Sequence, residues 1–189
     1  MNTYADRILE IVLLSVSIGL IIWVVKLYGL AYRDQLTGLW NGRYFFRNGQ
    51  KMLDSYDINR IRPIVFFIDL DNLKSLNDNN SHKIGDLALK ALANIIEDLF
   101  EEIGLVARRS GDEFLILYIA NSDKDVRTAL LSLQEKLKDF SAYDDVGEMF
   151  NFSATIGMQE ISVGMTLKQA VNLADKKMLS NKRRRIADK

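Results

Sequence analysis

The chain has no cysteine, one histidine and one proline in 189 residues. Without cysteine, disulfides, thiol nucleophiles and cysteine-ligated zinc sites are excluded. The single histidine, His82, leaves no second imidazole for a histidine-based metal centre or a catalytic dyad. The formal net charge is zero, so no overall positive field attracts nucleic acid. Chemistry in this chain therefore has to come from carboxylates, lysines, arginines and the backbone.

The longest apolar run lies at the N-terminus. Residues 11–25 carry no charge, and the run extends over residues 8–32 with only Glu10 and Lys26 as charges. At 1.5 Å per residue such a helix is longer than the ~30 Å hydrocarbon core of a bilayer. Its apolar residues would surround the helix on all sides, as lipid contact requires. We expect residues 1–32 to form a transmembrane anchor in contact with membrane lipid; a buried core helix is the alternative.

The charges that flank this run predict its orientation. Lys26 and Arg33 follow the apolar run, whereas Asp6, Arg7 and Glu10 precede it. The positive-inside rule then puts the rest of the chain in the cytoplasm. The expected protein is single-pass, in the inner (cytoplasmic) membrane.

Residues 33–189 are expected to form one domain. Apolar periodicity predicts helices over residues 41–56, 84–103, 123–139 and 167–184, and strands over residues 64–70, 106–119 (a hairpin) and 150–158. Asn41 and Asp123 are the expected N-caps of their helices. This order predicts an α+β fold: a ferredoxin-like sandwich with a mostly antiparallel sheet and flanking helices.

Two acidic clusters lie at the ends of predicted strands. Asp69 and Asp71 end the apolar run 64–68, and Asp112 and Glu113 follow Gly111 at the hairpin turn. A single acidic residue in a turn is usually a solvated cap, but two clusters at neighbouring strand tips would converge and could hold Mg²⁺. We expect Asp69 and Asp71 to face opposite sides of the sheet, one as a metal ligand and the other in a structural role.

Basic and polar residues near these clusters offer partners for a nucleotide. Lys74 is placed to meet a phosphate, and Asp86 either complements its helix dipole or binds the polar edge of a base. The basic run at residues 182–185 (KRRR) could complement its own helix dipole, bind anionic lipid or bind a triphosphate. From the residues alone, the dipole and the lipid rank above the triphosphate, except for Lys182.

Several short segments, taken together, resemble the GGDEF family of diguanylate cyclases over residues 33–182. The resemblance rests on residues 34–41 (DQLTGLWN), 67–74 (FIDLDNLK), 77–78 (ND), 82–86 (HKIGD), 108–114 (RRSGDEF), 154–157 (ATIG) and 174–175 (AD). It implies a nucleotidyl-cyclase-like fold and the condensation of two GTP into the bacterial second messenger cyclic di-GMP, with release of pyrophosphate. Each domain would hold one GTP, and two domains would meet as a homodimer for catalysis.

The resemblance also implies a role for particular residues. Mg²⁺ or Mn²⁺ would be bound by Asp69, by the carbonyl of Leu70 and by Asp112. Asp112 would also be the base for the 3′-hydroxyl, with Glu113 beside it in the active site. The remaining matches imply that Lys74 stabilises the reacting phosphates, that Asn77 and Asp86 recognise guanine, and that Lys182 binds the triphosphate.

The sequence departs from the family pattern at a few positions. Ser110 replaces the first glycine of the signature turn, Ser81 replaces a glycine before His82, and Arg185-Ile186 replaces a usual glycine-arginine pair. The family's product-inhibition motif would fall on residues 101–104 and is absent, which predicts no feedback inhibition through that site.

These departures leave an alternative open: a degenerate domain that binds GTP or a protein partner without catalysis. A cyclase that makes another dinucleotide is a third interpretation. Asp86 argues against it, because a carboxylate accepts hydrogen bonds from the N1–H and N2–H₂ groups that guanine has and adenine lacks. Nucleic acid is not an expected partner, because no aromatic residues interleave with the basic run.

Overall fold

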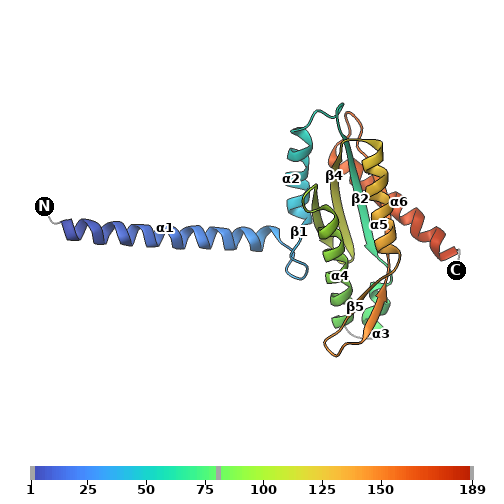
Figure 1. The fold of residues 1–189 in the computed structure, drawn as a ribbon, viewed down its shortest axis with the longest axis horizontal. Coiled ribbons are helices and arrows are strands. Elements are labelled where there is room, and N and C mark those ends of the chain that lie inside the picture. The colour runs from blue at the N-terminus through green and yellow to red at the C-terminus, as the bar shows by residue number, and fades with distance from the viewer. Residues whose placement is uncertain (1–2, 80–81, 188–189) are drawn as a thin grey trace.

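The computed structural model describes residues 3–79 and 82–187. A long helix, α1 (Thr3–Tyr32), leads into a folded domain and projects away from it (Figure 1). The substitution at Ser81 lies outside the described residues. The large apolar side chains of α1 from Ile8 to Leu30 are 43–66% exposed, so no other part of the described structure covers them.

The domain alternates helices and strands. Its elements are β1 (Trp40–Asn41), α2 (Gly42–Asp54), β2 (Arg62–Leu70), α3 (Leu73–Asn79), α4 (His82–Phe100), β3 (Gly104–Ser110), β4 (Glu113–Ala120), α5 (Asp123–Lys138), β5 (Phe140–Tyr143), β6 (Met149–Phe152), β7 (Ala154–Glu160) and α6 (Leu167–Ala187). The main sheet has the strand order β1-β3-β4-β2-β7, and β5 pairs with β6 in a separate two-stranded sheet. The long pairings of the main sheet are antiparallel, and β1 runs parallel to β3.

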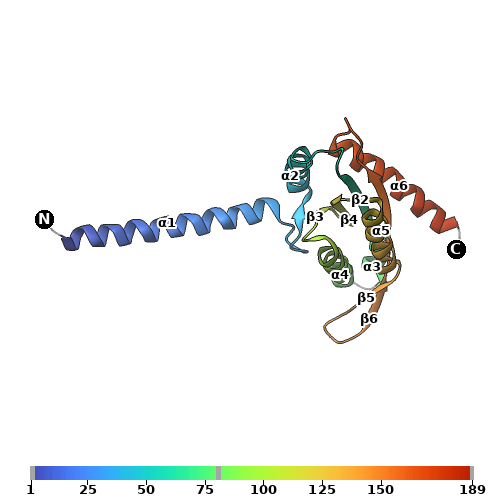
Figure 2. The same cartoon turned by 45° about the horizontal axis from the view of Figure 1, so that its top comes forward.

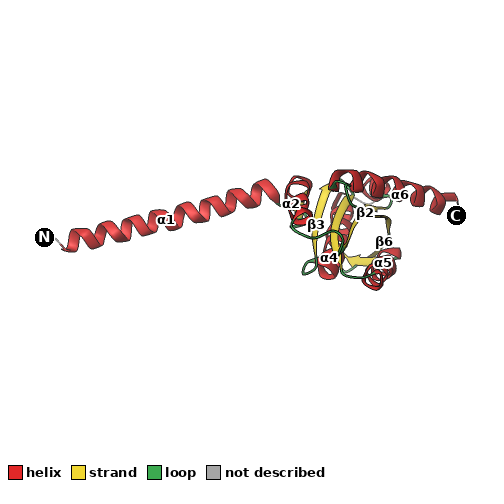
Figure 3. Cartoon of the chain, turned by 90° about the horizontal axis from the view of Figure 1, so that it is seen from above, coloured by secondary structure: helices red, strands yellow, loops and turns green. Residues whose placement is uncertain are grey.

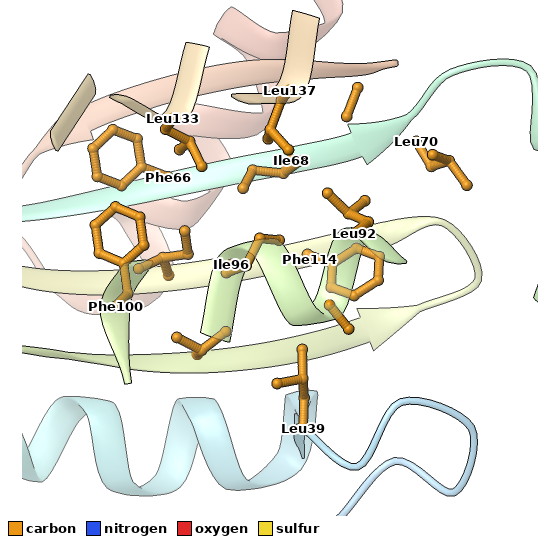
Figure 4. Packing of buried hydrophobic residues seen from close by; sticks show 14 of the residues in the cluster. Leu39, Phe66, Ile68, Leu70, Leu92, Ile96, Phe100, Phe114, Leu133 and Leu137 are labelled. Carbon is orange, nitrogen blue, oxygen red and sulfur yellow. The ribbon is translucent and has the colours of Figure 1, made fainter. Parts of the chain in front are cut away.

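The sheet lies between two layers of helices. Figures 2 and 3 show α2 and α6 on one side of the sheet and α4 and α5 on the other. Because side chains alternate along a strand, β2 serves both layers: Phe66 and Ile68 pack toward α4 and α5 (Figure 4), and Val65 and Phe67 pack toward α2 and α6. The expected near-continuous apolar strand at the centre of the sheet is confirmed, as is the mostly antiparallel α+β sandwich.

Two expectations about local structure are wrong. The strand predicted over residues 150–158 is two strands, because the chain leaves the β5–β6 hairpin at Ser153 and joins the main sheet at Ala154. The Ser153 carbonyl accepts a hydrogen bond from the Asp71 N–H (2.9 Å), which holds the break beside the end of β2. The N-cap of α5 is Ser122, whose side chain accepts from the Asp125 N–H (3.2 Å), and Asp123 is the first helical residue. Asn41 does cap α2, accepting from the Tyr44 N–H at 3.1 Å.

Candidate nucleotide and metal site

Asp69 is a buried carboxylate at the end of the central strand. The residue is 9% exposed, and it lies on the same strand face as Phe67, toward α6. Its carboxylate forms an ion pair with the ammonium group of Lys182 on α6. Two residues predicted from separate parts of the sequence therefore meet at one place.

The signature hairpin is joined to the end of β2 by backbone contacts. In the β2–β4 register Asp69 lies opposite Glu113, and the Leu70 N–H donates to the Asp112 carbonyl at 3.0 Å. Gly111 has a φ of 50°, which supplies the left-handed residue that the two-residue turn needs. The predicted convergence of Asp69, Asp112 and Glu113 at neighbouring strand ends is present.

The charges around Asp69 act on its proton affinity in opposite directions. Burial raises the pKa of Asp69 above 3.8, while the hydrogen bond from Lys182 lowers it and the negative charge of Asp112 raises it. The net shift is upward, so this carboxyl is less readily ionised than an ordinary aspartate. A cation at this position would reverse the effect by stabilising the ionised form.

Asp71 turns to the same side as Asp69, so the expectation of opposite faces is wrong. β2 ends at Leu70, but the chain stays extended for one more residue, and side chains two residues apart in extended chain share a face. The Asp71 carboxylate accepts hydrogen bonds from Ser153 (2.8 Å) and Thr155 (2.7 Å) and pairs with Arg185 at 2.6 Å. Asp71 is therefore fully engaged in joining β2, β7 and α6, which agrees with the structural role expected for one member of the pair.

Asn77 lies against α4 at Gly85, where the absence of a side chain lets it approach closely. A Cβ added to Gly85 would stand 2.0 Å from Asn77 Oδ1. Within residues 3–79 and 82–187, Asn77 Oδ1 is the buried side-chain oxygen that has no hydrogen-bond partner. Such an atom is costly unless something donates to it. Asp86, which follows Gly85 in α4, is exposed.

A cavity of about 610 Å³ opens beside Asp86. It lies between α4 and the β5–β6 hairpin, and Lys83, Lys90 and Asp144 also line it. Asn77 does not line this cavity, so the structure brings Asn77 and Asp86 near each other without joining them in one pocket. Lys74 is exposed on α3.

Sequence reasoning missed a link between the hairpin turn and the start of the domain. Arg108 donates to the Gly111 carbonyl at 3.0 and 2.7 Å and pairs with Asp34 at 3.0 Å. The side chain of Asp34 also accepts from the N–H and the hydroxyl of Thr37. Burial raises the pKa of Asp34, but the hydrogen bonds from Thr37 and Arg108 outweigh it and the net shift is downward. The segment at residues 34–37 was recognised only as part of a motif.

The residues present fit a hard divalent cation. Carboxylate and carbonyl oxygens are the donors that Mg²⁺ and Mn²⁺ prefer, and the charge of Asp112 acts on the pKa of Asp69, so the two carboxylates lie within electrostatic range. The described residues hold no group of three or more His, Cys, Asp or Glu side chains arranged around a metal position. Asp69, Asp112 and the Leu70 carbonyl would supply two carboxylates and one backbone oxygen. Such a set has only two acidic side chains, so it is compatible with the absence of a three-residue group among the described residues.

Comparison with known proteins identifies the family. The family described as "Diguanylate cyclase, GGDEF domain" matches residues 31–186. The diguanylate cyclase DgcP of Escherichia coli K12 is 29% identical over 154 residues, which are 81% of this chain and 45% of that protein. This chain thus spans about half or less of the length of the first curated relatives that it matches.

Solved structures agree with this match. A GGDEF-domain structure of PA1120 (TpbB or YfiN) from Pseudomonas aeruginosa is 29% identical, with a TM-score of 0.74 over 81% of this chain and 90% of that one. The coiled coil and GGDEF domain of DgcB from Caulobacter crescentus, in complex with c-di-GMP, gives a TM-score of 0.83 at 19% identity, over 97% of this chain and 95% of that one. The fold is the α+β fold of GGDEF domains, a mixed sheet with flanking helices. The chain belongs to the GGDEF diguanylate cyclase family.

Proposed function

We propose that this protein is a membrane-anchored diguanylate cyclase that condenses two GTP molecules into cyclic di-GMP and two pyrophosphates. The observation that carries the proposal is the meeting of Asp69 with Asp112, Glu113 and Lys182 at the end of the central strand. Carboxylates and an ammonium group at one point suit a metal-bound triphosphate. The carboxylates bind the cation, and the ammonium group offsets the negative charge of the phosphates.

In the proposed reaction the 3′-oxygen of one GTP attacks the α-phosphorus of the other. The bond between the α-phosphorus and the bridging oxygen breaks, pyrophosphate leaves, and the second 3′-oxygen repeats the step. Asp112 takes the proton of the attacking hydroxyl, with Glu113 beside it. Lys74 and Lys182 hold the phosphate oxygens against the site, which lowers the entropic cost of in-line attack.

Mg²⁺ or Mn²⁺ would be held by Asp69, Asp112 and the Leu70 carbonyl, and when bound it would offset phosphate charge in the transition state. The guanine ring of GTP is assigned to the other end of the site, near Asn77 and Asp86. Asn77 Oδ1, buried without a partner among the described residues, would accept from the amino group of guanine, and Asp86 would accept from its N1–H and N2–H₂ groups. Because each domain holds one GTP, the proposal requires two domains facing each other.

The competing function is that of a degenerate domain that binds GTP without turnover. The full chain in detergent, incubated with GTP and Mg²⁺ at low and high protein concentration, separates the two. The proposal predicts cyclic di-GMP by chromatography, a rate per protein that rises with concentration, and loss of product in Asp112→Ala but not in the exposed control Glu135→Ala. GTP binding without product at high concentration favours the degenerate domain.

The helix α1 supports the membrane anchoring that we propose. Residues Asp6–Tyr32 form an apolar helix long enough to cross a bilayer. The hydroxyls inside it are satisfied within the helix, since Ser15 donates to the Val12 carbonyl and Ser17 to the Leu13 carbonyl, both at 2.8 Å. Lipid requires such internal satisfaction of polar groups.

An aromatic cluster marks the domain end of α1. The rings of Tyr28 and Tyr32 lie 4.7 Å apart, the Tyr44 ring stacks on Trp40 at 3.7 Å, and Arg33 lies over Trp40 at 3.5 Å. Aromatic and cationic side chains of this kind favour the headgroup region of a membrane. We therefore propose a single crossing in the inner membrane with the domain in the cytoplasm. The protein should remain in the membrane fraction after alkaline carbonate extraction. Release into the soluble fraction would contradict the anchor and would favour α1 as part of a coiled coil, as in the DgcB structure.

A further inference from the structure

A row of polar side chains crosses four strands at the site. The registers place Ser110 (β3) opposite Glu113 (β4), Glu113 opposite Asp69 (β2), and Asp69 opposite Thr155 (β7). Directly opposed residues on neighbouring strands share a face and stand about 5 Å apart at Cβ. Ser110, the residue that departs from the family signature, is thus part of the same row as the proposed metal ligand Asp69.

Ser110 makes a specific contact within this row. Its hydroxyl donates to Glu113 Oε2 at 2.9 Å, and Arg109 Nη1 lies 3.4 Å from the same oxygen. Glu113 is partly exposed, with 29% of its side chain accessible, so these two contacts restrict a carboxylate that solvent can reach. The hydroxyl that glycine would lack therefore holds the second carboxylate of the signature.

The backbone accepts serine at this position without strain. Among the described residues the only non-glycine residue with a positive φ is Asn72. Ser110 therefore avoids the left-handed conformation, although the β3–β4 register shifts between Arg108 and Ser110. The left-handed conformation of the turn is taken by Gly111. The substitution thus adds a hydroxyl and a fixed contact, and the turn itself needs no adjustment.

We propose that Ser110 is a positioning residue: its hydroxyl fixes the Glu113 carboxylate opposite Asp69, where the negative charge of Glu113 would attract the cation that Asp69 and Asp112 hold. This inference rests on the proposed function and deepens it. Ordering a glutamate side chain costs rotamer entropy, and a side chain ordered in advance does not incur that cost when the metal binds. The opposite interpretation is that Ser110 obstructs the approaching phosphate.

The first experiment compares three substitutions at this position in the full chain. Ser110→Ala and Ser110→Gly should each lower kcat roughly three- to tenfold, the range expected for losing one hydrogen bond to a partly exposed charged group. They should raise the Mg²⁺ concentration needed for half-maximal rate and leave the KM for GTP nearly unchanged. Ser110→Thr, which keeps a hydroxyl, should restore the rate, and Ser141→Ala on the exposed side of β5 is the matched control. Equal or higher activity in Ser110→Gly would overturn the proposal.

The second experiment does not depend on turnover. Binding of Mn²⁺ is titrated by electron paramagnetic resonance in the presence of a GTP analogue with a methylene group between the α- and β-phosphorus atoms. Ser110→Ala should weaken Mn²⁺ binding severalfold in the wild-type background and have no further effect in Glu113→Ala. An equal loss in both backgrounds would mean that Ser110 does not act through Glu113 and would overturn the proposal. Mn²⁺ binding that follows this pattern in a protein that makes no cyclic di-GMP would support the positioning role while rejecting the proposed function.

Discussion

The two ends of the candidate site differ in how the fold holds them. The metal end, with Asp69, Asp112 and Glu113, is part of the sheet, so backbone hydrogen bonds and strand register determine where each carboxylate lies. The base end, with Asn77 and Asp86, comes from two helices, and it contains a buried oxygen that lacks a partner among the described residues. The difference teaches that the proposed chemistry depends on residues held by strand register, whereas the proposed recognition of guanine depends on a buried oxygen that a ligand would pair.

The largest effect should follow from substitution at the metal end. Asp69→Asn should lower kcat by about 10³-fold, since it removes a charged metal ligand from the reacting centre. The same change should leave the Tm of the unliganded protein unchanged or raise it by about 2–4 °C, because a buried carboxylate whose pKa is raised opposes folding when it is ionised. Product chromatography and thermal unfolding measure the two effects. A large fall in both activity and Tm would mean that Asp69 is structural.

A substitution at the base end should act on affinity and leave the chemical step nearly intact. Asp86→Asn should lower kcat/KM for GTP about 10–100-fold, mainly through KM, because the amide presents a donor where guanine also has a donor. It should also narrow the preference for GTP over ITP, which lacks the N2 amino group. Asp98→Asn, exposed on the same helix, is the control. A fall in kcat at constant KM would assign Asp86 to the chemistry and break the comparison.

Substitution of Asp71 should act on stability, whereas substitution of Asp69 should act on catalysis, although the two residues lie close together on the same face. Asp71→Ala removes the acceptor shared by Ser153, Thr155 and Arg185. It should destabilise the protein by about 2–3 kcal/mol, since partly buried donors lose their partner, and lower Tm by about 4–10 °C. Chemical denaturation gives the free energy of unfolding, with Asp98→Ala as the surface control. A loss of activity at unchanged stability would contradict the structural role.

The smallest expected effect is a pH dependence of metal affinity. Burial and the charge of Asp112 raise the pKa of Asp69 more than Lys182 lowers it. A metal binds the ionised form, so Mg²⁺ affinity should fall as pH drops through this raised pKa, by up to tenfold per unit below it, and the fall should begin above pH 3.8, the ordinary value. Without metal the sign is opposite: the contribution of Asp69 to stability is present below the unfolded pKa and is lost as pH rises through the folded one. Titration of the methylene analogue complex with Mg²⁺ at several pH values measures the first effect. An affinity independent of pH in that range would exclude Asp69 as a ligand.

The sequence was sufficient for the parts of the fold that strong patterns encode. The apolar run at residues 64–70 predicted a central strand, and Ser110, Gly111 and Asp112 predicted the hairpin turn. The break at Ser153 was not predictable from alternation, because Phe152 and Ala154 are both buried even though they belong to different sheets. The ion pair of Arg185 with Asp71 also escaped prediction, since it joins residues that are 114 positions apart and depends on how α6 docks.

A crystal structure of the protein with Mg²⁺ and the methylene GTP analogue is the most direct test of this division of the site. We expect the cation on Asp69, Asp112 and the Leu70 carbonyl, the phosphates toward Lys182, and guanine between Asn77 and Asp86. A nucleotide bound with its base at the hairpin end, or a cation away from Asp69, would contradict the division of the site into a metal end and a base end.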